Sequence, residues 1–390
     1  MLFLPKSAIE AERNLPERLS NGDDNPIKIL VVNRYQFPIE VQIVDEIPHQ
    51  FQIRDFKIEA EVSSGSEKWF GYKIRPLKRG VYSFGKLNIY CQSPLRFIER
   101  RYIFDEGQEV PVYPSFIQMK KYELLAISNK LVETGIKKIR KIGTQTEFDH
   151  IREYVIGDDY RTMNWKATAR KTSFMVNQHQ DERSQQVYAI IDMGRVMRMP
   201  FEGMTLLDYA INTSLAILNI AIKKYDKAGL LTFTEQIETF LPAERKGSQM
   251  TMIMELLYSQ TTRFAESNYE LLYTTVQRKI RHRSLLILYT NFESLVSVKR
   301  QLPYLKRLAK SHLLLVVFFS NTEISSILKT RPSNLDEIYR KTIAEKFAFE
   351  KRQIINEFLR YGIHSVLTTP ANLTVGTINK YLEFKARGMI

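Results

Sequence analysis

The chain has 390 residues, of which 44% are hydrophobic and 26% charged, the composition of a globular protein that is too long for one ordinary core. Its 57 lysines and arginines against 43 acidic residues give a formal net charge of +14, which favours an anionic partner such as a membrane surface, nucleic acid or an acidic protein. The single cysteine, Cys91, excludes an intramolecular disulfide, and no apolar run reaches the roughly 20 residues of a membrane-spanning helix.

The N-terminal part of the chain is predicted to be a tether followed by a β-domain. Residues 1–25 alternate in charge and end in a cluster of turn-forming residues, which predicts a tether. Residues 26–116 hold short runs of alternating apolar and polar side chains, separated by turn signals such as Pro48 and Gly80. About seven such runs without a helical period predict an antiparallel β-sandwich of immunoglobulin-like kind.

Residues 117–186 are expected to bridge two domains. Within this bridge begins the stretch 147–192, the densest run of charged, aromatic and turn-forming residues in the chain. Its arginines could form a phosphate or carboxylate pocket, and its aromatic side chains could stack on nucleic-acid bases. The third interpretation is an ion-pair network that locks the segment across two domains, with Trp165 as a buried anchor.

Residues 187–390 predict a doubly wound α/β domain, because near-continuous apolar runs alternate with helical patterns. Most of the excess positive charge falls here. The whole chain is therefore expected to be an α+β two-domain protein. Strands are expected at 187–192, 229–233, 284–291, 312–319 and 364–369, with an edge partner at 236–243, and helices at 205–227, 248–260, 268–282, 297–310, 333–361 and 372–387.

A ligand in such a sheet would bind at the carboxyl ends of the strands. The first strand ends at Asp192, whose carboxylate could hold a divalent cation if other loops supplied oxygen ligands. The candidates are Thr205, Asp208, Thr290 and Asn291. Alternatively, Asp192 caps the N-terminus of a following helix. The sequence contains no phosphate-binding glycine loop, zinc motif or serine elbow, so no catalytic residue is predicted.

The run REYVIGDDYRTMNWKATARK, residues 152–171, resembles the signature of the domain-of-unknown-function 58 family of bacterial proteins, roughly E-F-x-x-L-R-x-Y-x-x-G-D-x-x-R-x-I-x-W-x-x-S-A-R. Thr168 stands where serine is usual and Ile151 where leucine is. The positions that meet the pattern are Glu147, Phe148, Arg152, Tyr154, Gly157, Asp158, Arg161, Trp165, Ala169 and Arg170. Upstream matches are Arg13 to Pro16, Gly22 with Asp23, Asn33, Asp45 with Pro48, Arg79 with Gly80, Ser93 to Leu95, and Val112 to Pro114.

This resemblance implies a β-sandwich followed by a Rossmann-like domain of the von Willebrand factor type A-like kind. It also implies a non-catalytic adaptor that serves a MoxR-type AAA+ ATPase in a chaperone-like or envelope-stress role. The protein is then expected to be bacterial and cytoplasmic, or held at the inner face of the cytoplasmic membrane by an N-terminal hairpin that this chain lacks. The expected interaction residues are Arg152, Tyr154, Gly157, Asp158, Arg161, Trp165 and Arg170.

The chain departs from the metal-dependent adhesion pattern Asp-x-Ser-x-Ser. It has Asp192-Met-Gly-Arg-Val, and Asn291 stands where such sites carry a later aspartate. With Asp192, Thr205 and Asn291 as the degenerate candidates, we expect no cofactor and at most weak divalent binding. The alternatives are a metal-dependent hydrolase or adhesion protein that uses Asp192, and a basic surface for an anionic membrane or, less expected, nucleic acid. No small-molecule substrate is expected.

Overall fold

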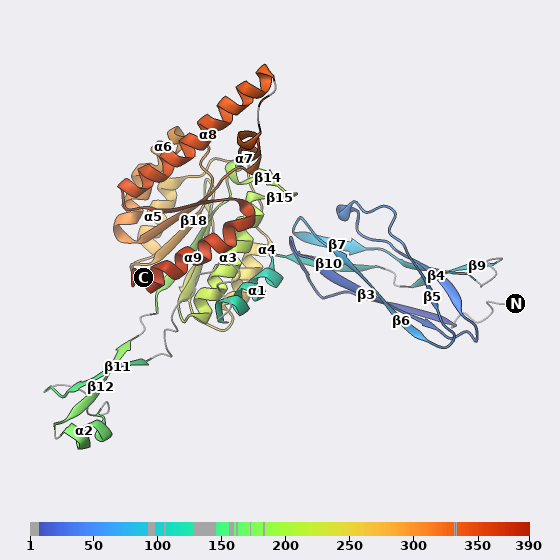
Figure 1. Cartoon of the computed structure of the whole chain (residues 1–390), viewed down its shortest axis with the longest axis horizontal. Helices are drawn as coiled ribbons and strands as arrows, with labels where there is room; N and C mark the ends of the chain where they lie inside the picture. The colour runs from blue at the N-terminus through green and yellow to red at the C-terminus, as the bar shows by residue number, and fades with distance from the viewer. Residues whose placement is uncertain are drawn as a thin grey trace.

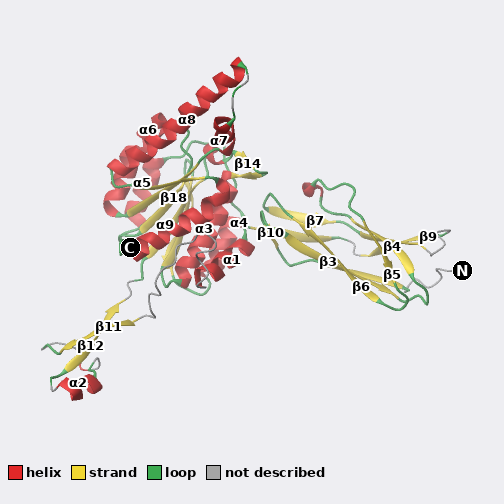
Figure 2. Cartoon of the chain, in the orientation of Figure 1, coloured by secondary structure: helices red, strands yellow, loops and turns green. Residues whose placement is uncertain are grey.

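The computed structural model describes residues 8–92, 98–104, 107–127, 146–155, 160, 163–171, 173–181, 184–330, 332 and 334–390. Two lobes and a projecting arm make up the described chain (Figure 1). The lobe that holds the N-terminus is built almost entirely of strands, whereas helices flank the sheet of the other lobe (Figure 2). The expected combination of a β-sandwich and an α/β domain is therefore confirmed.

The N-terminal lobe is a β-sandwich of three small sheets, ordered β1-β3-β6, β2-β10-β7 and β5-β4-β8-β9. Every described pair is antiparallel except β2 with β10. Side chains of β3 and β4 alternate between buried and more exposed, as their period-two sequence predicts. The strands are β1 (Ile9–Asn14), β2 (Leu19–Ser20), β3 (Asn25–Asn33), β4 (Ile39–Asp45), β5 (Ile58–Val62), β6 (Glu67–Ile74), β7 (Gly80–Phe84), β8 (Leu87–Gln92), β9 (Glu99–Phe104) and β10 (Gln108–Tyr113), with a 3-10 turn η1 at His49–Phe51.

The expected tether over residues 1–25 is wrong from Ile9 onward, because β1 and β2 lie there. β1 pairs along its whole length with β3 and buries Ile9 in the sandwich core. Its Arg13 is also buried, and its guanidinium meets the carboxylate of Asp45 at 2.5 Å. The hydroxyl of Tyr72 donates to the other oxygen of Asp45 at 2.5 Å. One of the charges that suggested a solvated tether, that of Arg13, is thus neutralised inside the fold, whereas the other charged side chains between Glu10 and Arg18 are exposed.

The second lobe is a six-stranded sheet in the order β17-β16-β13-β18-β19-β20. Five strands are parallel, and β17 is the antiparallel edge. The chain builds outward from β13 through β16 to β17, then returns to the other side of β13 with β18, so the winding reverses between β13 and β18. The strands are β13 (Gln186–Asp192), β16 (Lys227–Phe233), β17 (Ile237–Glu244), β18 (Leu285–Tyr289), β19 (Leu313–Phe319) and β20 (His364–Thr368).

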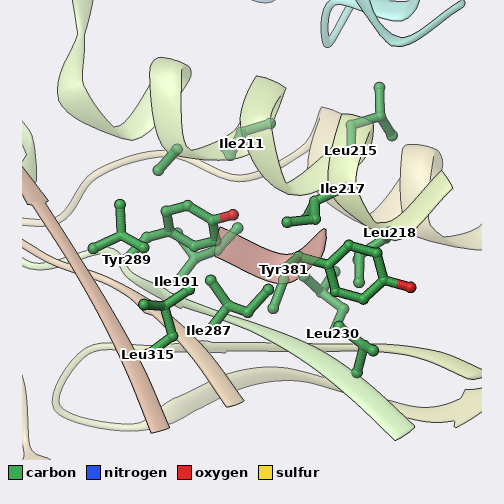
Figure 3. Close-up of a cluster of buried hydrophobic side chains, with 14 of the residues drawn as sticks. Ile191, Ile211, Leu215, Ile217, Leu218, Leu230, Ile287, Tyr289, Leu315 and Tyr381 are labelled. Atoms are coloured by element: carbon green, nitrogen blue, oxygen red, sulfur yellow. The ribbon is translucent and has the colours of Figure 1, made fainter. Parts of the chain in front are cut away.

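Helices cover both faces of this sheet because each of its central strands is apolar on both sides. Helices α1, α3, α4 and α9 share one core cluster with the sheet, and α5, α6 and α8 share the other. Figure 3 shows α3 side chains over strand residues in the first cluster. The helices are α1 (Phe116–Ile127), α3 (Leu206–Lys223), α4 (Gln249–Tyr258), α5 (Tyr269–Lys279), α6 (Leu295–Ser311), α7 (Thr322–Lys329), α8 (Leu335–Arg360) and α9 (Leu373–Ala386). Short elements are η4 (Arg195–Met197), β14 (Pro200–Phe201), β15 (Met204–Thr205) and η5 (Pro370–Asn372).

Between α1 and β13 the chain forms the arm, which projects away from both lobes in Figure 1. It consists of β11 (Thr146–Glu153), paired antiparallel with β12 (Met175–Asp181), and the short helix α2 (Trp165–Lys171). Helix α1, which falls within the expected bridge, packs on α3 and places Met119 in the core of the α/β lobe.

The two lobes meet where β7 and β10 face α3 and α4. The aromatic rings of Tyr113 and Tyr258 stack with centroids 4.6 Å apart. The amide of Ser115 donates to Asn212 of α3 at 2.9 Å. Arg79 reaches across to Asp208 of α3, and it is followed by Gly80 at φ +134°, a backbone conformation that favours glycine.

Candidate functional site

The clearest candidate site lies at the carboxyl ends of β13 and β18, where the strand order reverses. Ligand crevices of open α/β sheets occupy this position. Asp192 ends β13, and Thr290 and Asn291 follow β18 directly. A pocket of about 240 Å³ opens there, with Asp192, Ser267 and Asn291 among its lining residues. The sequence-based placement of Asp192 and Asn291 at one edge of the sheet therefore agrees with the structure.

The Asp192 carboxylate is buried, with only 1% of the residue exposed, and both of its oxygens accept hydrogen bonds from the protein. Oδ1 accepts the backbone N–H of Gly194 at 2.8 Å and the hydroxyl of Ser267. Oδ2 accepts the hydroxyl of Thr290 at 2.7 Å and that of Tyr269 at 3.3 Å. Burial raises the pKa of Asp192, although these bonds act in the opposite direction. The side chain is therefore the centre of a dense polar network that joins three segments.

The other metal-ligand candidates do not complete a site. Thr205 forms a capping box with Asp208 at the start of α3 and lies outside the Asp192 pocket. Asn291 lines that pocket, but its Oδ1 accepts a hydrogen bond from Lys351 Nζ at 3.1 Å. Within the residues that the structure describes, no three His, Cys, Asp or Glu side chains gather as metal ligands.

The surroundings of Gly194 leave no room for the serine that the metal-dependent adhesion motif has at this position. Gly194 occupies the place of the first serine of Asp-x-Ser-x-Ser. A Cβ atom on Gly194 would collide with the Ser267 hydroxyl and would lie 3.1 Å from Asp192 Oδ1. The alternative that Asp192 caps a helix is wrong, because the N-cap residue of the following turn η4 is Gly194 and no side chain caps that turn.

Sequence reasoning missed Ser267 and Tyr269, which supply two of the four donors to Asp192. The available signal was the Ser-Asn-Tyr run before a helical pattern, because Asn268 caps α5 and accepts the N–H of Leu271. At the mouth of the pocket, Glu266 pairs with Arg195 at 3.4 Å and with Arg300 at 3.1 Å. Both ion pairs are exposed and hence weak.

The signature residues on the arm form a second candidate site. Asn164 and Thr168 fix α2 against β12: the Asn164 amide donates to Asn177 at 2.7 Å, and Thr168 Oγ1 accepts the N–H of Met175 at 3.0 Å. The hydroxyl of Thr168 thus has a structural role that serine would share. With that face of α2 held inward, Trp165 points outward.

Trp165 is 67% exposed, so the interpretation of this residue as a buried anchor is wrong. Exposed apolar residues accompany it on the arm: Val155, Tyr160 at 70% exposure, and Phe174. Arg170 is also exposed, whereas Arg152 and Tyr154 are half-buried, with Tyr154 against the edge of Phe174. The remaining signature positions, Gly157, Asp158 and Arg161, lie outside the described residues, as do Ser93 to Leu95.

The chain is similar in sequence to a curated protein and in fold to several solved structures. The chain is 21% identical over 255 residues to the uncharacterized protein YeaD of Bacillus subtilis (strain 168), a match that spans 62% of this chain and 60% of that protein. Similar solved structures include the conserved hypothetical protein BatB from Bacteroides thetaiotaomicron, with 13% identity, a TM-score of 0.36, and coverage of 53% of this chain and 100% of that one. The SpRpn10 VWA domain gives 12% identity, a TM-score of 0.34, and coverage of 50% and 93%.

For the sandwich, the CARDB domain of the PF1109 protein from Pyrococcus furiosus is similar, with 13% identity, a TM-score of 0.21, and coverage of 27% of this chain and 86% of that one. None of the helices in the described ranges combines the length and apolarity needed to cross a bilayer. Residues 150–323 match the family model described as "Protein of unknown function DUF58". This part of the chain, which includes most of the arm and the α/β lobe from β13 to the start of α7, is therefore similar to that family.

Proposed function

We propose that the protein is a non-catalytic adaptor that binds a protein partner through its arm. The exposure of Trp165 is the observation that carries this proposal. A tryptophan buries a large apolar surface when it is covered, and tryptophan is among the residues that most often dominate protein interfaces. Here Trp165 stands 67% exposed on a seven-residue helix at the far end of a projecting element.

The surroundings of Trp165 favour a partner with an apolar pocket and an acidic rim. Tyr160 and Phe174 add exposed aromatic surface on the same arm. Lys166 and Arg170 are exposed on α2 beside it. Apolar anchors flanked by charges of one sign give affinity through burial and give orientation through electrostatic complementarity.

The family resemblance suggests a MoxR-type AAA+ ATPase as this partner, in a chaperone-like or envelope-stress role. The Asp192 network would then be structural: it ties the loops at the carboxyl edge of the sheet together rather than holding a reactive group. Support for that part comes from the four protein donors that already occupy both carboxylate oxygens.

The test is binding of the full chain to a MoxR-type ATPase from the same organism, measured by biolayer interferometry with ATP, with ADP and without nucleotide. Trp165→Ala should weaken binding by about tenfold or more, as expected for a hot-spot residue. Trp69→Ala is the matched control, because Trp69 is the other tryptophan and is 56% exposed, but lies on the sandwich. Equal affinity of wild type and Trp165→Ala would refute the arm as the binding site, and no binding of wild type would refute this partner.

A further inference from the structure

A second cavity lies beside the Asp192 pocket, away from the arm. Its volume is about 890 Å³, within the range of sites that hold small organic ligands. It is lined by β14, the end of β19, α7, the middle of α8 and the loop after β20. Figure 1 shows α7, β14 and β15 at the same end of the sheet.

The walls of this cavity are mainly apolar. Their side chains come from five separate elements, so the cavity is a feature of the folded lobe and not of one helix. The apolar lining residues that matter here are Phe201, Phe319, Ile324, Leu328, Phe347 and Leu367. Such walls favour the hydrocarbon part of a ligand, which gains by leaving water.

Lys351 of α8 places a cation in the lining. Its Nζ atom donates to Asn291 Oδ1 at 3.1 Å and to the carbonyl of Phe292, and lies 5.4 Å from the ring centre of Phe318. Asn291, Phe292 and Phe318 are all buried, so the ammonium sits at the inner end of the cavity. Burial lowers its pKa from 10.5 to about 8.

Two hydrogen bonds leave one of the three ammonium donors available for a ligand. Among the ion pairs of the described residues, none joins Lys351 to a carboxylate. The acidic lining residues Glu202, Glu293 and Glu323 are exposed at the rim, where water weakens their effect. Of these, Glu293 acts on Lys351 and raises its pKa, against the larger effect of burial. The cation is therefore the polar group that an enclosed ligand would meet at the inner end.

We propose that this cavity binds an amphipathic carboxylate, with its hydrocarbon chain along the apolar walls and its carboxylate on Lys351 Nζ. A neutral apolar ligand would bury the ammonium without an anion, which is costly, and a cationic ligand would be repelled. A carboxylate satisfies the ammonium through a charge-assisted hydrogen bond, the stronger kind. The inference does not depend on the arm or on its partner.

Calorimetric titration of the full chain with dodecanoate below its micelle concentration tests the proposal. 1-Dodecanol and dodecyltrimethylammonium serve as neutral and cationic head-group controls. We expect saturable binding of one dodecanoate per chain, weakened about tenfold or more by Lys351→Met, which keeps the chain length and removes the charge. Lys346→Met, an exposed lysine of the same helix outside the cavity lining, should bind like wild type.

A second variant keeps the test decisive if Lys351→Met folds poorly. Ala348→Trp fills the cavity from α8 while leaving Lys351 in place, and it should abolish binding. Circular dichroism with and without dodecanoate checks that the fold persists. Absence of saturable binding, equal affinity for dodecyltrimethylammonium, or wild-type affinity in a folded Lys351→Met or Ala348→Trp protein would each overturn the proposal.

Discussion

Removing Arg79 should uncouple the two lobes. The Arg79 guanidinium reaches from the sandwich into the α/β lobe, where Nε donates to Asp208 Oδ1 at 3.0 Å. Its terminal nitrogens donate to backbone carbonyls at the end of α4: those of Leu257, Tyr258 at 3.4 Å and Gln260 at 2.6 Å. The side chains of Arg79 and Asp208 are only 7% and 9% exposed. A cation at this helix end also interacts favourably with the helix dipole.

The variant Arg79→Met removes these bonds and leaves Asp208 buried without its cation. Breaking one partner of a buried ion pair costs about 3–5 kcal/mol. Asp208 keeps its bonds from the backbone N–H and the hydroxyl of Thr205, at 3.1 and 2.6 Å, so the lower end of that range, about 3 kcal/mol, is expected. Because these hydrogen bonds join the two lobes, their loss should weaken the contact between the lobes. The lobes should then unfold in separate transitions.

Urea unfolding would measure this, with far-ultraviolet circular dichroism for the whole chain and scanning calorimetry to resolve transitions. Lys78→Met, the exposed neighbour in sequence, is the control and should change stability by less than about 0.5 kcal/mol. Asp208→Asn and the double variant complete a cycle that isolates the pair. If Arg79→Met unfolds like wild type in a single transition, the side chain does not couple the lobes and the reasoning fails.

Three further predictions concern the carboxyl edge of the sheet. Asp192→Ala should lower the free energy of unfolding in urea by about 3 kcal/mol, because several buried donors lose their acceptor. Calorimetry with Mg²⁺ or Mn²⁺ should show no micromolar binding to the wild-type protein. Tight metal binding that Asp192→Ala abolishes would contradict the expectation of a metal-free site. Gly194→Ser should lower the melting temperature, whereas the double variant Gly194→Ser/Ser267→Gly, which removes the colliding hydroxyl, should recover part of the loss. Between pH 8 and 10.5 the unfolded chain holds a proton that native Lys351 has lost, so the free energy of unfolding should rise with pH in that window, and this contribution should be missing in Lys351→Met.

Much of the α/β lobe follows from its sequence because the pattern is local. The strands β13, β18 and β19 are short, uninterrupted apolar runs, and burial on both faces of a parallel sheet requires that composition. The strand β1 could not be predicted in the same way. Its buried Arg13 depends on partners distant in the chain, Asp45 at 32 positions and the carbonyl of Gly85 at 72. Helix α7 was also not expected.

The candidate sites also contain some features that the local sequence predicts and others that depend on contacts between distant parts of the chain. The position of Asp192 follows from the rule that strand ends gather at one edge. The approach of Ser267 and Tyr269 depends on how α5 packs under that edge, which no local pattern specifies. Trp165 illustrates the converse case: its residue type suggests a core position, but Asn164 and Thr168 turn the opposite face of α2 inward.

The way the arm is attached has a consequence for how substitutions on it act. The elements that precede and follow the arm, α1 and β13, both pack against α3. The packing of the α/β lobe is therefore continuous at the place where the arm leaves it. The arm is thus inserted between two elements of the α/β lobe, and its own structure depends little on contacts with the core of that lobe. Substitutions of its exposed side chains should therefore cost the α/β lobe little stability, because few of its packing contacts involve the arm.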